Sequence, residues 1–190
     1  MPQEEVDLVV KNACQLLTLQ SDEKGPRHGA RMEDLGLVSD GAVAASEGLI
    51  VTVGTTDEVM TAISVGPQTT IIDARDMVVM PGFVDPHTHP VFAGSREEEF
   101  ELRIKGASYQ EIAASGGGIR SSVRSLRQAT YEQLIELARP RLDRMLSFGT
   151  TTAEAKSGYG LSLTDELKSL EAIAQLNREH PLDLIPTFLG

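Results

Sequence analysis

A chain of 190 residues can form one domain of ordinary size or two small ones, and 41% hydrophobic with 24% charged residues is typical of a soluble globular protein. The formal net charge of −11 and the lack of a basic cluster argue against nucleic acid or an anionic membrane as a partner. Cys14 has no second cysteine to pair with, the N-terminus is acidic, and no apolar run approaches the roughly 20 residues that span a bilayer. These features predict a cytoplasmic protein, in which Cys14 is a small buried hydrophobic residue.

The first 80 residues are predicted to form a small β-rich, sandwich-like domain. Four short runs rich in β-branched residues, separated by turn residues, predict strands at residues 6–10, 41–45, 48–53 and 70–73. Residues 21–34 are rich in charge, Gly and Pro, which predicts an exposed loop.

From residue 81 onward strands alternate with helices. Apolar runs predict strands at residues 78–84, 149–154 and 183–189, and apolar periodicity predicts helices at residues 108–114, 131–148 and 164–179. This alternation indicates parallel strands with helical crossovers, as in a doubly wound sheet or a barrel.

Local signals refine the two longer helices. Thr130 and Gln133 form a capping box at the start of the first, and Pro140 predicts a kink within it. The buried face of the second is predicted to carry Leu167, Leu170, Ile173 and Ala174.

The most informative motif is P-G-F-V-D-P-H-T-H at residues 81–89. Side chains two apart on a strand share a face, so Asp85, His87 and His89 are expected to point the same way at the end of the strand. Imidazole is a favoured ligand of zinc and iron, and a divalent ion lowers the pKa of bound water toward neutrality. The motif therefore predicts that His87 and His89 bind a metal ion.

A β-rich segment followed by this motif resembles the amidohydrolase superfamily, whose members place such a histidine pair at the end of the first strand of a (β/α)8 TIM barrel. Residues 92–97, 116–119 and 150–161 are similar to the imidazolonepropionase family in particular. The resemblance covers nearly the whole chain. It implies an N-terminal β-domain at residues 1–80, which lacks the strands that family members add from the C-terminal end of their chain. It also implies that residues 81–190 form the first three βα units of the barrel.

The resemblance also implies a function. Family members open the cyclic amide of 4-imidazolone-5-propanoate to N-formimidoyl-L-glutamate in histidine degradation, with one divalent ion, zinc or iron. His87 and His89 match metal ligands, whereas Arg96 and Tyr159 match residues that contact the substrate. A guanidinium suits the substrate's carboxylate tail.

Each remaining polar residue also has a structural interpretation. Arg96 could pair with Glu97, Glu98 or Glu99 at the surface, and Tyr159 could simply pack. Glu154 and Lys156 are interpreted as an internal ion pair, and residues 116–118 as a mobile glycine loop. His28 and His180 are interpreted as solvated or structural.

A complete (β/α)8 barrel takes about 250 residues, more than remain after residue 81. The catalytic acid and base are therefore expected downstream of residue 190, and the chain alone is expected to be an inactive fragment. Two alternatives stay open: another amidohydrolase, such as a purine deaminase or a dihydroorotase-like enzyme, and a non-catalytic interaction fragment. The expected partner is the small-molecule substrate, and the full-length protein is a possible homodimer.

Overall fold

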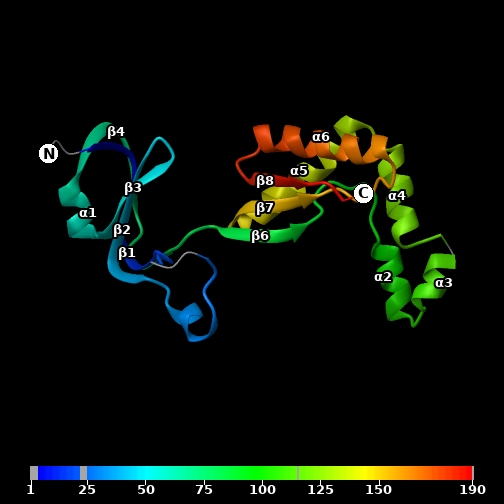
Figure 1. Ribbon diagram of the computed structural model, residues 1–190, viewed down its shortest axis with the longest axis horizontal. Helices are drawn as coiled ribbons and strands as arrows, with labels where there is room; N and C mark the ends of the chain where they lie inside the picture. Colours follow the sequence, from blue (N-terminus) through cyan, green and yellow to red (C-terminus); the bar gives the residue numbers. More distant parts are fainter. Residues whose placement is uncertain (1–3, 22–24, 115, 190) are drawn as a thin grey trace. The chain divides into compact units, whose positions relative to one another are not determined.

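The computed structural model describes residues 4–21, 25–114 and 116–189 (Figure 1). The chain divides into two compact units, Met1–Pro81 and Gly82–Gly190, which are considered separately. Among the described residues, no helix has the length and apolar character that crossing a membrane requires.

The N-terminal unit is built on one five-stranded mixed sheet. Its strands are β1 (Glu4–Leu17), β2 (Leu37–Ser46), β3 (Leu49–Thr55), β4 (Ile63–Asp73) and β5 (Val78–Val79). Their order is β3-β2-β1-β4, and β5 also pairs with β1. β1 runs antiparallel to β2 and parallel to β4 and β5. All four strands predicted before residue 75 are confirmed, and each is longer than predicted, whereas the sandwich-like arrangement stays a prediction.

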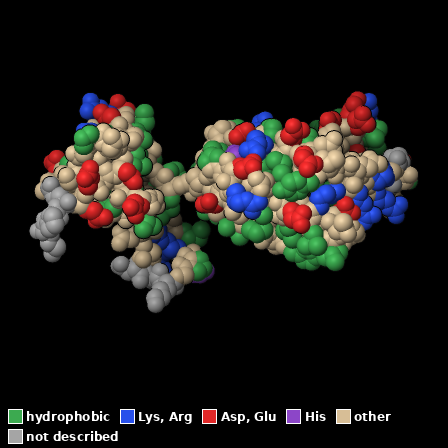
Figure 2. Space-filling model, turned by 90° about the horizontal axis from the view of Figure 1, so that it is seen from above, with side chains coloured by type: hydrophobic (Ala, Val, Ile, Leu, Met, Phe, Trp, Pro, Cys, Tyr) green, Lys and Arg blue, Asp and Glu red, His purple; other side chains and the backbone are tan. Residues whose placement is uncertain are grey.

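Two short helices belong to this unit. The 3-10 helix η1 (Gly29–Glu33) lies in the predicted loop, and α1 (Thr56–Ala62) was not predicted. α1 begins with a capping box: Thr55 accepts from the Glu58 N–H, and the Glu58 carboxylate accepts from the Thr55 N–H. This Thr-x-x-Glu pattern could have predicted the start of the helix from the sequence. Acidic side chains are scattered over the face of this unit seen in Figure 2, in keeping with the net charge.

The prediction that Cys14 is buried is wrong, since its side chain is exposed. The register of β1 shifts between Val10 and Ala13, where Asn12 adopts a positive φ of 61°. Beyond this bulge Ala13 and Leu16 face the core, so Cys14 faces away from it.

The C-terminal unit contains a three-stranded parallel sheet covered on one face by two helices (Figure 1). The strands β6 (Phe83–Thr88), β7 (Thr150–Lys156) and β8 (Asp183–Thr187) lie in that order, which confirms the predicted parallel pairing. Buried Ala153, Ala155 and Leu184 face α5 (Tyr131–Ser147) and α6 (Leu163–Glu179). The other face leaves Val84 and Ile185 exposed.

Three smaller helices, α2 (Glu97–Ile104), α3 (Tyr109–Ala114) and α4 (Ile119–Gln128), lie between β6 and α5. Only α3 was predicted. α2 buries none of its residues. α4 carries Ile119, Val123 and Leu126 at i, i+4 and i+7, a helical apolar spacing that was overlooked, although only Leu126 is buried.

One further strand prediction needs correction. A single strand at residues 78–84 is wrong, because β5 and β6 are separate strands on either side of Pro81, which has no N–H to donate to a ladder.

The capping box of α5 is confirmed. α5 continues through Pro140 as one helix, and the kink at Pro140 stays a prediction.

The predicted face of α6 is also wrong in part. Ile173 is buried, but Leu167 and Ala174 are exposed and Leu170 is half-buried. The buried residues of the helix are instead Glu166, Ser169, Ala172, Ile173 and Leu176.

Candidate active site

The carboxyl-terminal end of β6 brings two histidines together. The ring centroids of His87 and His89 are 5.9 Å apart, with an angle of 66° between the ring planes. With metal–nitrogen bonds of about 2.0–2.1 Å, two imidazoles on one ion have centroids about 5–6 Å apart. Asp85 Oδ1 accepts from the backbone N–H of His87 at 3.2 Å, and the shared face of Asp85 with the two histidines stays a prediction.

One atom of this pair lacks a partner. His89 Nδ1 is buried and has no hydrogen bond within the described structure. Leaving a buried polar atom unpaired is costly, so this nitrogen fits a residue that needs an ion or a hydrogen-bonding group from outside the described chain. Catalytic zinc usually has three protein ligands. Residues 4–21, 25–114 and 116–189 contain no cluster of three or more His, Cys, Asp or Glu side chains that could hold a metal.

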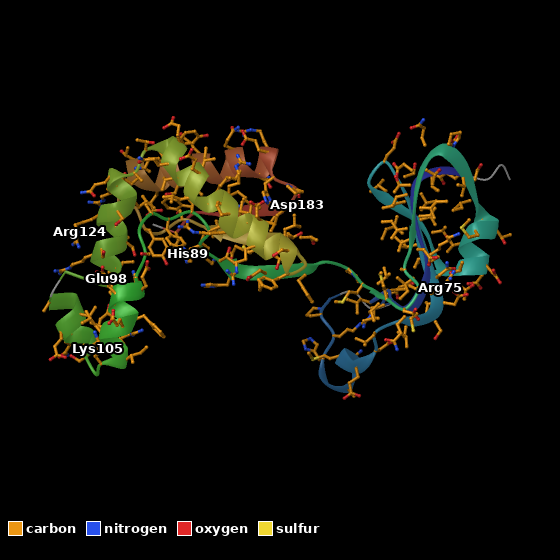
Figure 3. The ribbon with its side chains drawn as sticks, turned by 180° about the vertical axis from the view of Figure 1, so that it is seen from behind. Arg75, His89, Glu98, Lys105, Arg124 and Asp183 are labelled. Atoms are coloured by element: carbon orange, nitrogen blue, oxygen red, sulfur yellow. The ribbon has the colours of Figure 1, made fainter. Side chains whose placement is uncertain are left out.

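Tyr159 joins the histidines from the loop after β7. Its ring centroid lies 5.1 Å from that of His89 and 6.3 Å from that of Phe92 (Figure 3 labels His89). The two strands therefore place a metal-ligand candidate and a substrate-contact candidate side by side. Catalytic residues of barrel enzymes gather at the carboxyl-terminal ends of their strands in the same way.

The segment that follows the histidines is held by Arg141 of α5. Its Nη1 donates to the carbonyl oxygens of Pro90 at 3.0 Å and Phe92 at 2.8 Å. The guanidinium carbon also lies 3.5 Å from the centre of the Phe92 ring. Burial lowers the pKa of Arg141, but a guanidinium stays charged in proteins. Sequence reasoning missed this residue because its partners are backbone atoms about 50 positions away.

The loop of residues 157–161 is held by Glu166, which was also missed. This carboxylate is 1% exposed and accepts from the backbone N–H groups of Gly158 at 2.6 Å and of Gly160 and Leu161 at 2.8 Å. Burial raises the pKa of Glu166, but hydrogen bonds from the Ser157 side chain and from these three N–H groups outweigh it and hold the pKa below its usual value.

Glu154 and Lys156 form the predicted ion pair on β7, with Lys156 Nζ 2.7 Å from Glu154 Oε1. Thr187 of β8 donates to the same oxygen at 2.8 Å. The hydrogen bonds from Lys156 and Thr187, with smaller contributions from the charges of Lys156 and His87, lower the pKa of Glu154. The pair thus keeps a charged carboxylate close to the histidines.

Arg96 lies at the start of α2, where its Nε and Nη2 donate to Ser122 Oγ at 3.0 and 2.8 Å. Its side chain is exposed and borders a cavity of about 220 Å³ shared with Phe100, Arg103 and Tyr109. The structural interpretation of Arg96 predicted a pair with Glu97, Glu98 or Glu99, whereas its hydrogen-bond partner is the hydroxyl of Ser122. No contact joins it to His87, His89 or Tyr159 within the described part of the chain, and its contact with substrate stays a prediction.

The glycine segment has a structural role where it is described. Gly118 precedes α4 with a φ of 68°, and its N–H donates to Glu99 Oε1 at 2.8 Å. Residue 115, just before the segment, lies outside the described residues.

The other two histidines agree with their structural interpretation. His28 is exposed in the N-terminal unit. His180 is buried, its Nδ1 accepts from the Leu182 N–H at 3.0 Å, and its Nε2 therefore carries the proton toward Asp143, 3.1 Å away.

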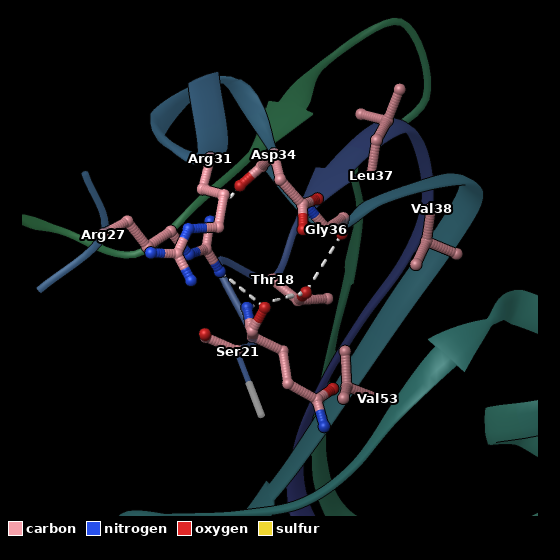
Figure 4. Close-up of a pocket in the computed structure, with 10 residues that line it drawn as sticks. Thr18, Ser21, Arg27, Arg31, Asp34, Gly36, Leu37, Val38 and Val53 are labelled. Atoms are coloured by element: carbon pink, nitrogen blue, oxygen red, sulfur yellow. Dashed lines mark hydrogen bonds between the residues drawn. The ribbon is translucent and has the colours of Figure 1, made fainter. Parts of the chain in front are cut away.

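A cavity of about 770 Å³ lies in the N-terminal unit (Figure 4). Its Arg27 donates to the carbonyl oxygens of Leu19, Gln20 and Asp34, and Thr18 Oγ1 donates to the carbonyl of Gly36. These side chains hold the backbone of residues 18–20 and 34–36 in place. The histidine cluster in the C-terminal unit is therefore the better candidate for chemistry.

Known proteins resemble the chain in sequence and in fold. No family model matches the chain. Curated relatives named imidazolonepropionase match it at 55% identity in Symbiobacterium thermophilum and 47% in Alkaliphilus metalliredigens, each over 97% of the chain. The chain spans 43% of the length of these relatives. It resembles the N-terminal part of an imidazolonepropionase.

Solved structures agree at the level of fold. A zinc-bound adenosine deaminase from Xanthomonas campestris matches 98% of the chain and 43% of its own, with a TM-score of 0.60 and 18% identity. The guanine deaminase of E. coli matches 95% of the chain and 35% of its own, with a TM-score of 0.57 and 18% identity. The chain thus shares a mixed α/β fold with these two deaminases over the part that it covers.

Proposed function

We propose that the chain is the N-terminal part of a metal-dependent hydrolase that opens 4-imidazolone-5-propanoate to N-formimidoyl-L-glutamate. The observation that carries this proposal is the meeting of His87, His89 and Tyr159 at the carboxyl-terminal ends of β6 and β7. The identity to imidazolonepropionases supports this substrate over those of the deaminases, which share only the fold.

In this proposal His87 and His89 hold one divalent ion, zinc or iron, with further ligands from the rest of the protein. The ion supplies Lewis acidity when it is bound. Their ring separation suits two ligands of one ion, and the unpaired Nδ1 of His89 marks that imidazole as one that needs a further partner.

The chain's other residues bind and orient the substrate. Tyr159 places a phenol beside His89, where it can donate to a polar group of the ring. Arg96 binds the carboxylate tail of the substrate. To do so, its guanidinium gives up the hydrogen bond to the neutral hydroxyl of Ser122 and donates to the charged carboxylate instead. The Glu154–Lys156 pair keeps both of its charges on the open face of the sheet.

The reaction adds water across one ring carbon–nitrogen bond. The carbonyl carbon becomes a carboxylate and the leaving nitrogen receives a proton. The general acid and base for these transfers are placed in the remainder of the protein, which also supplies the strands that close a (β/α)8 barrel over the exposed face of β6–β8. The proposed setting is the cytoplasm.

The test is hydrolysis by the purified full-length protein loaded with zinc or with iron. Loss of the ultraviolet absorbance of the imidazolone ring, with formation of N-formimidoyl-L-glutamate, is the expected result. Guanine, adenosine and dihydroorotate serve as competing substrates. Turnover of one of these and none of the imidazolone would replace the proposal by the corresponding amidohydrolase activity.

A further inference from the structure

Tyr159 lies on a loop whose own sequence does little to fix its shape. The loop, residues 157–161, connects β7 to α6, with Gly158 at a φ of +117° and Leu161 at +48°. Glycine is conformationally permissive, and a non-glycine residue at positive φ is uncommon. Groups outside the loop must therefore determine where Tyr159 points.

Glu166 satisfies the donors of this loop. Its carboxylate binds three loop N–H groups, those of Gly158, Gly160 and Leu161, from the first turn of α6. A buried charge is costly unless it is hydrogen-bonded, and here several donors converge on one carboxylate. Gly160 allows the close approach, since a Cβ at this position would lie 2.7 Å from the backbone carbonyl carbon of Asp165.

Arg127 of α4 satisfies the acceptors of the same loop. Its Nε donates to the carbonyl oxygen of Gly160 and its Nη2 to that of Leu161, both at 2.8 Å. Arg127 also lies 3.5 Å from Asp165, the neighbour of Glu166. The backbone between β7 and α6 is thus bound from one side by an anion and from the other by a cation.

We propose that Glu166 is a positioning residue, which fixes the loop of residues 157–161 so that the phenol of Tyr159 stays beside His89. The inference rests on the proposed function in one respect, the contact of Tyr159 with substrate. Within the described structure, no hydrogen bond or ion pair joins the Glu166 side chain to His89 or Tyr159.

The first test is independent of activity and uses Glu166→Gln in the full-length protein. An amide NH2 group offers a donor where the carboxylate offered an acceptor, so it opposes the loop N–H groups. Hydrogen exchange at Gly158, Gly160 and Leu161 should accelerate at least about tenfold, because the bonds lost are to a charged group. The Cε1–H resonance of His89, assigned by its loss in His89→Asn, should shift as the Tyr159 ring moves.

Glu171→Gln is the matched control, since Glu171 is exposed on the same helix. It should change neither measurement. Unchanged exchange in Glu166→Gln, or faster exchange with an unmoved His89 resonance, would overturn the positioning role.

The second test is kinetic. Glu166→Gln should raise KM for imidazolone propanoate about tenfold and change kcat less, because it disturbs substrate binding. In a Tyr159→Phe background the same substitution should add little, since both act through one phenol. Equal effects in the two backgrounds would assign Glu166 to stability alone. If Glu166→Gln fails to fold, Glu166→Asp keeps the charge and should give smaller changes in the same direction in both tests.

The two proposals fail in different ways. A wild-type protein without turnover of imidazolone propanoate would remove the proposed function, and the exchange and resonance data would still decide whether Glu166 positions Tyr159.

Discussion

The two residues predicted to contact substrate lie in surroundings of opposite character. Tyr159 packs on His89 and Phe92, and its loop is bound by the buried Glu166. Arg96 is exposed at the start of α2, a helix that buries no residue. We therefore distinguish a fixed side, built on β6, β7, α5 and α6 around Tyr159, from a loosely packed side around Arg96, α2 and α3.

The largest effect is expected on the fixed side, from His87→Ala combined with His89→Ala in the full-length protein. Removing both imidazoles should reduce metal content from near one ion per chain to near zero and reduce turnover by at least about a thousandfold. Elemental analysis and the absorbance assay measure both. His28→Ala, in the N-terminal unit, is the control, and unchanged metal content in the double variant would contradict the assignment.

Arg141→Met tests whether the turn after the histidines is part of the fixed side. It removes two hydrogen bonds to the carbonyls of Pro90 and Phe92 and the contact with the Phe92 ring. We expect a loss of about 2–4 kcal/mol in the free energy of unfolding, measured by denaturant titration.

Arg139→Met on the same helix is the matched control for Arg141. It breaks only the half-exposed pair with Glu179, which contributes about 0–1 kcal/mol. Equal losses of unfolding free energy in the two variants would show that Arg141 stabilises the fold no more than a surface arginine does.

Arg96→Met tests the loosely packed side. Loss of a charge-assisted contact with the substrate carboxylate should raise KM roughly 10- to 150-fold, with a smaller change in kcat and little change in stability. Arg120→Met on α4 provides a comparison, because Arg120 is also exposed. Unaltered kinetics would leave Arg96 as a surface residue bonded to Ser122.

Acid should loosen the fixed side through Glu166. Its pKa in the folded protein lies below the usual value of 4.5, so its stabilisation is present above that value and is lost as the pH falls through the folded pKa. As the pH falls below about 4.5, the Glu166→Gln variant should therefore lose less stability than the wild type, measured by denaturant titration at a series of pH values. Parallel stability curves for the two proteins would contradict this.

The smallest effect is expected from Lys105→Gln on the loosely packed side. It removes the i,i+4 pair with Glu101, in which both side chains are about two-thirds exposed. The free energy of unfolding should change by no more than about 0.5 kcal/mol. A larger loss would show that α2 is more tightly integrated than its exposure indicates.

The sequence predicted the parts of the molecule that depend on local periodicity. The strands and α5 follow from apolar runs and a capping box, and the parallel order of β6, β7 and β8 follows from their alternation with helices. The histidine pair could be predicted because two imidazoles two positions apart on a strand share a face and can bind one ion.

Other features could not be read in the same way. α2 buries none of its residues, and the bulge at Asn12 reverses the direction of Cys14. α4, in contrast, could have been predicted from the spacing of Ile119, Val123 and Leu126. Glu166 stands in the first turn of a helix, where an acidic residue usually faces solvent and favours the helix dipole. Its burial depends on N–H groups five to eight positions earlier, which no periodicity reveals.

The anion and cation that hold residues 157–161 have a consequence for protein engineering. The carboxylate follows the loop in the chain and the guanidinium of Arg127 precedes it by about 30 positions, on a different helix. A designer who transplants these five residues onto another scaffold would transfer the tyrosine without the groups that orient it. A transplant that keeps the orientation of the tyrosine must therefore include α4, β7, the loop and the first turn of α6. In protein engineering, the unit to transfer is a whole βα repeat rather than a single loop.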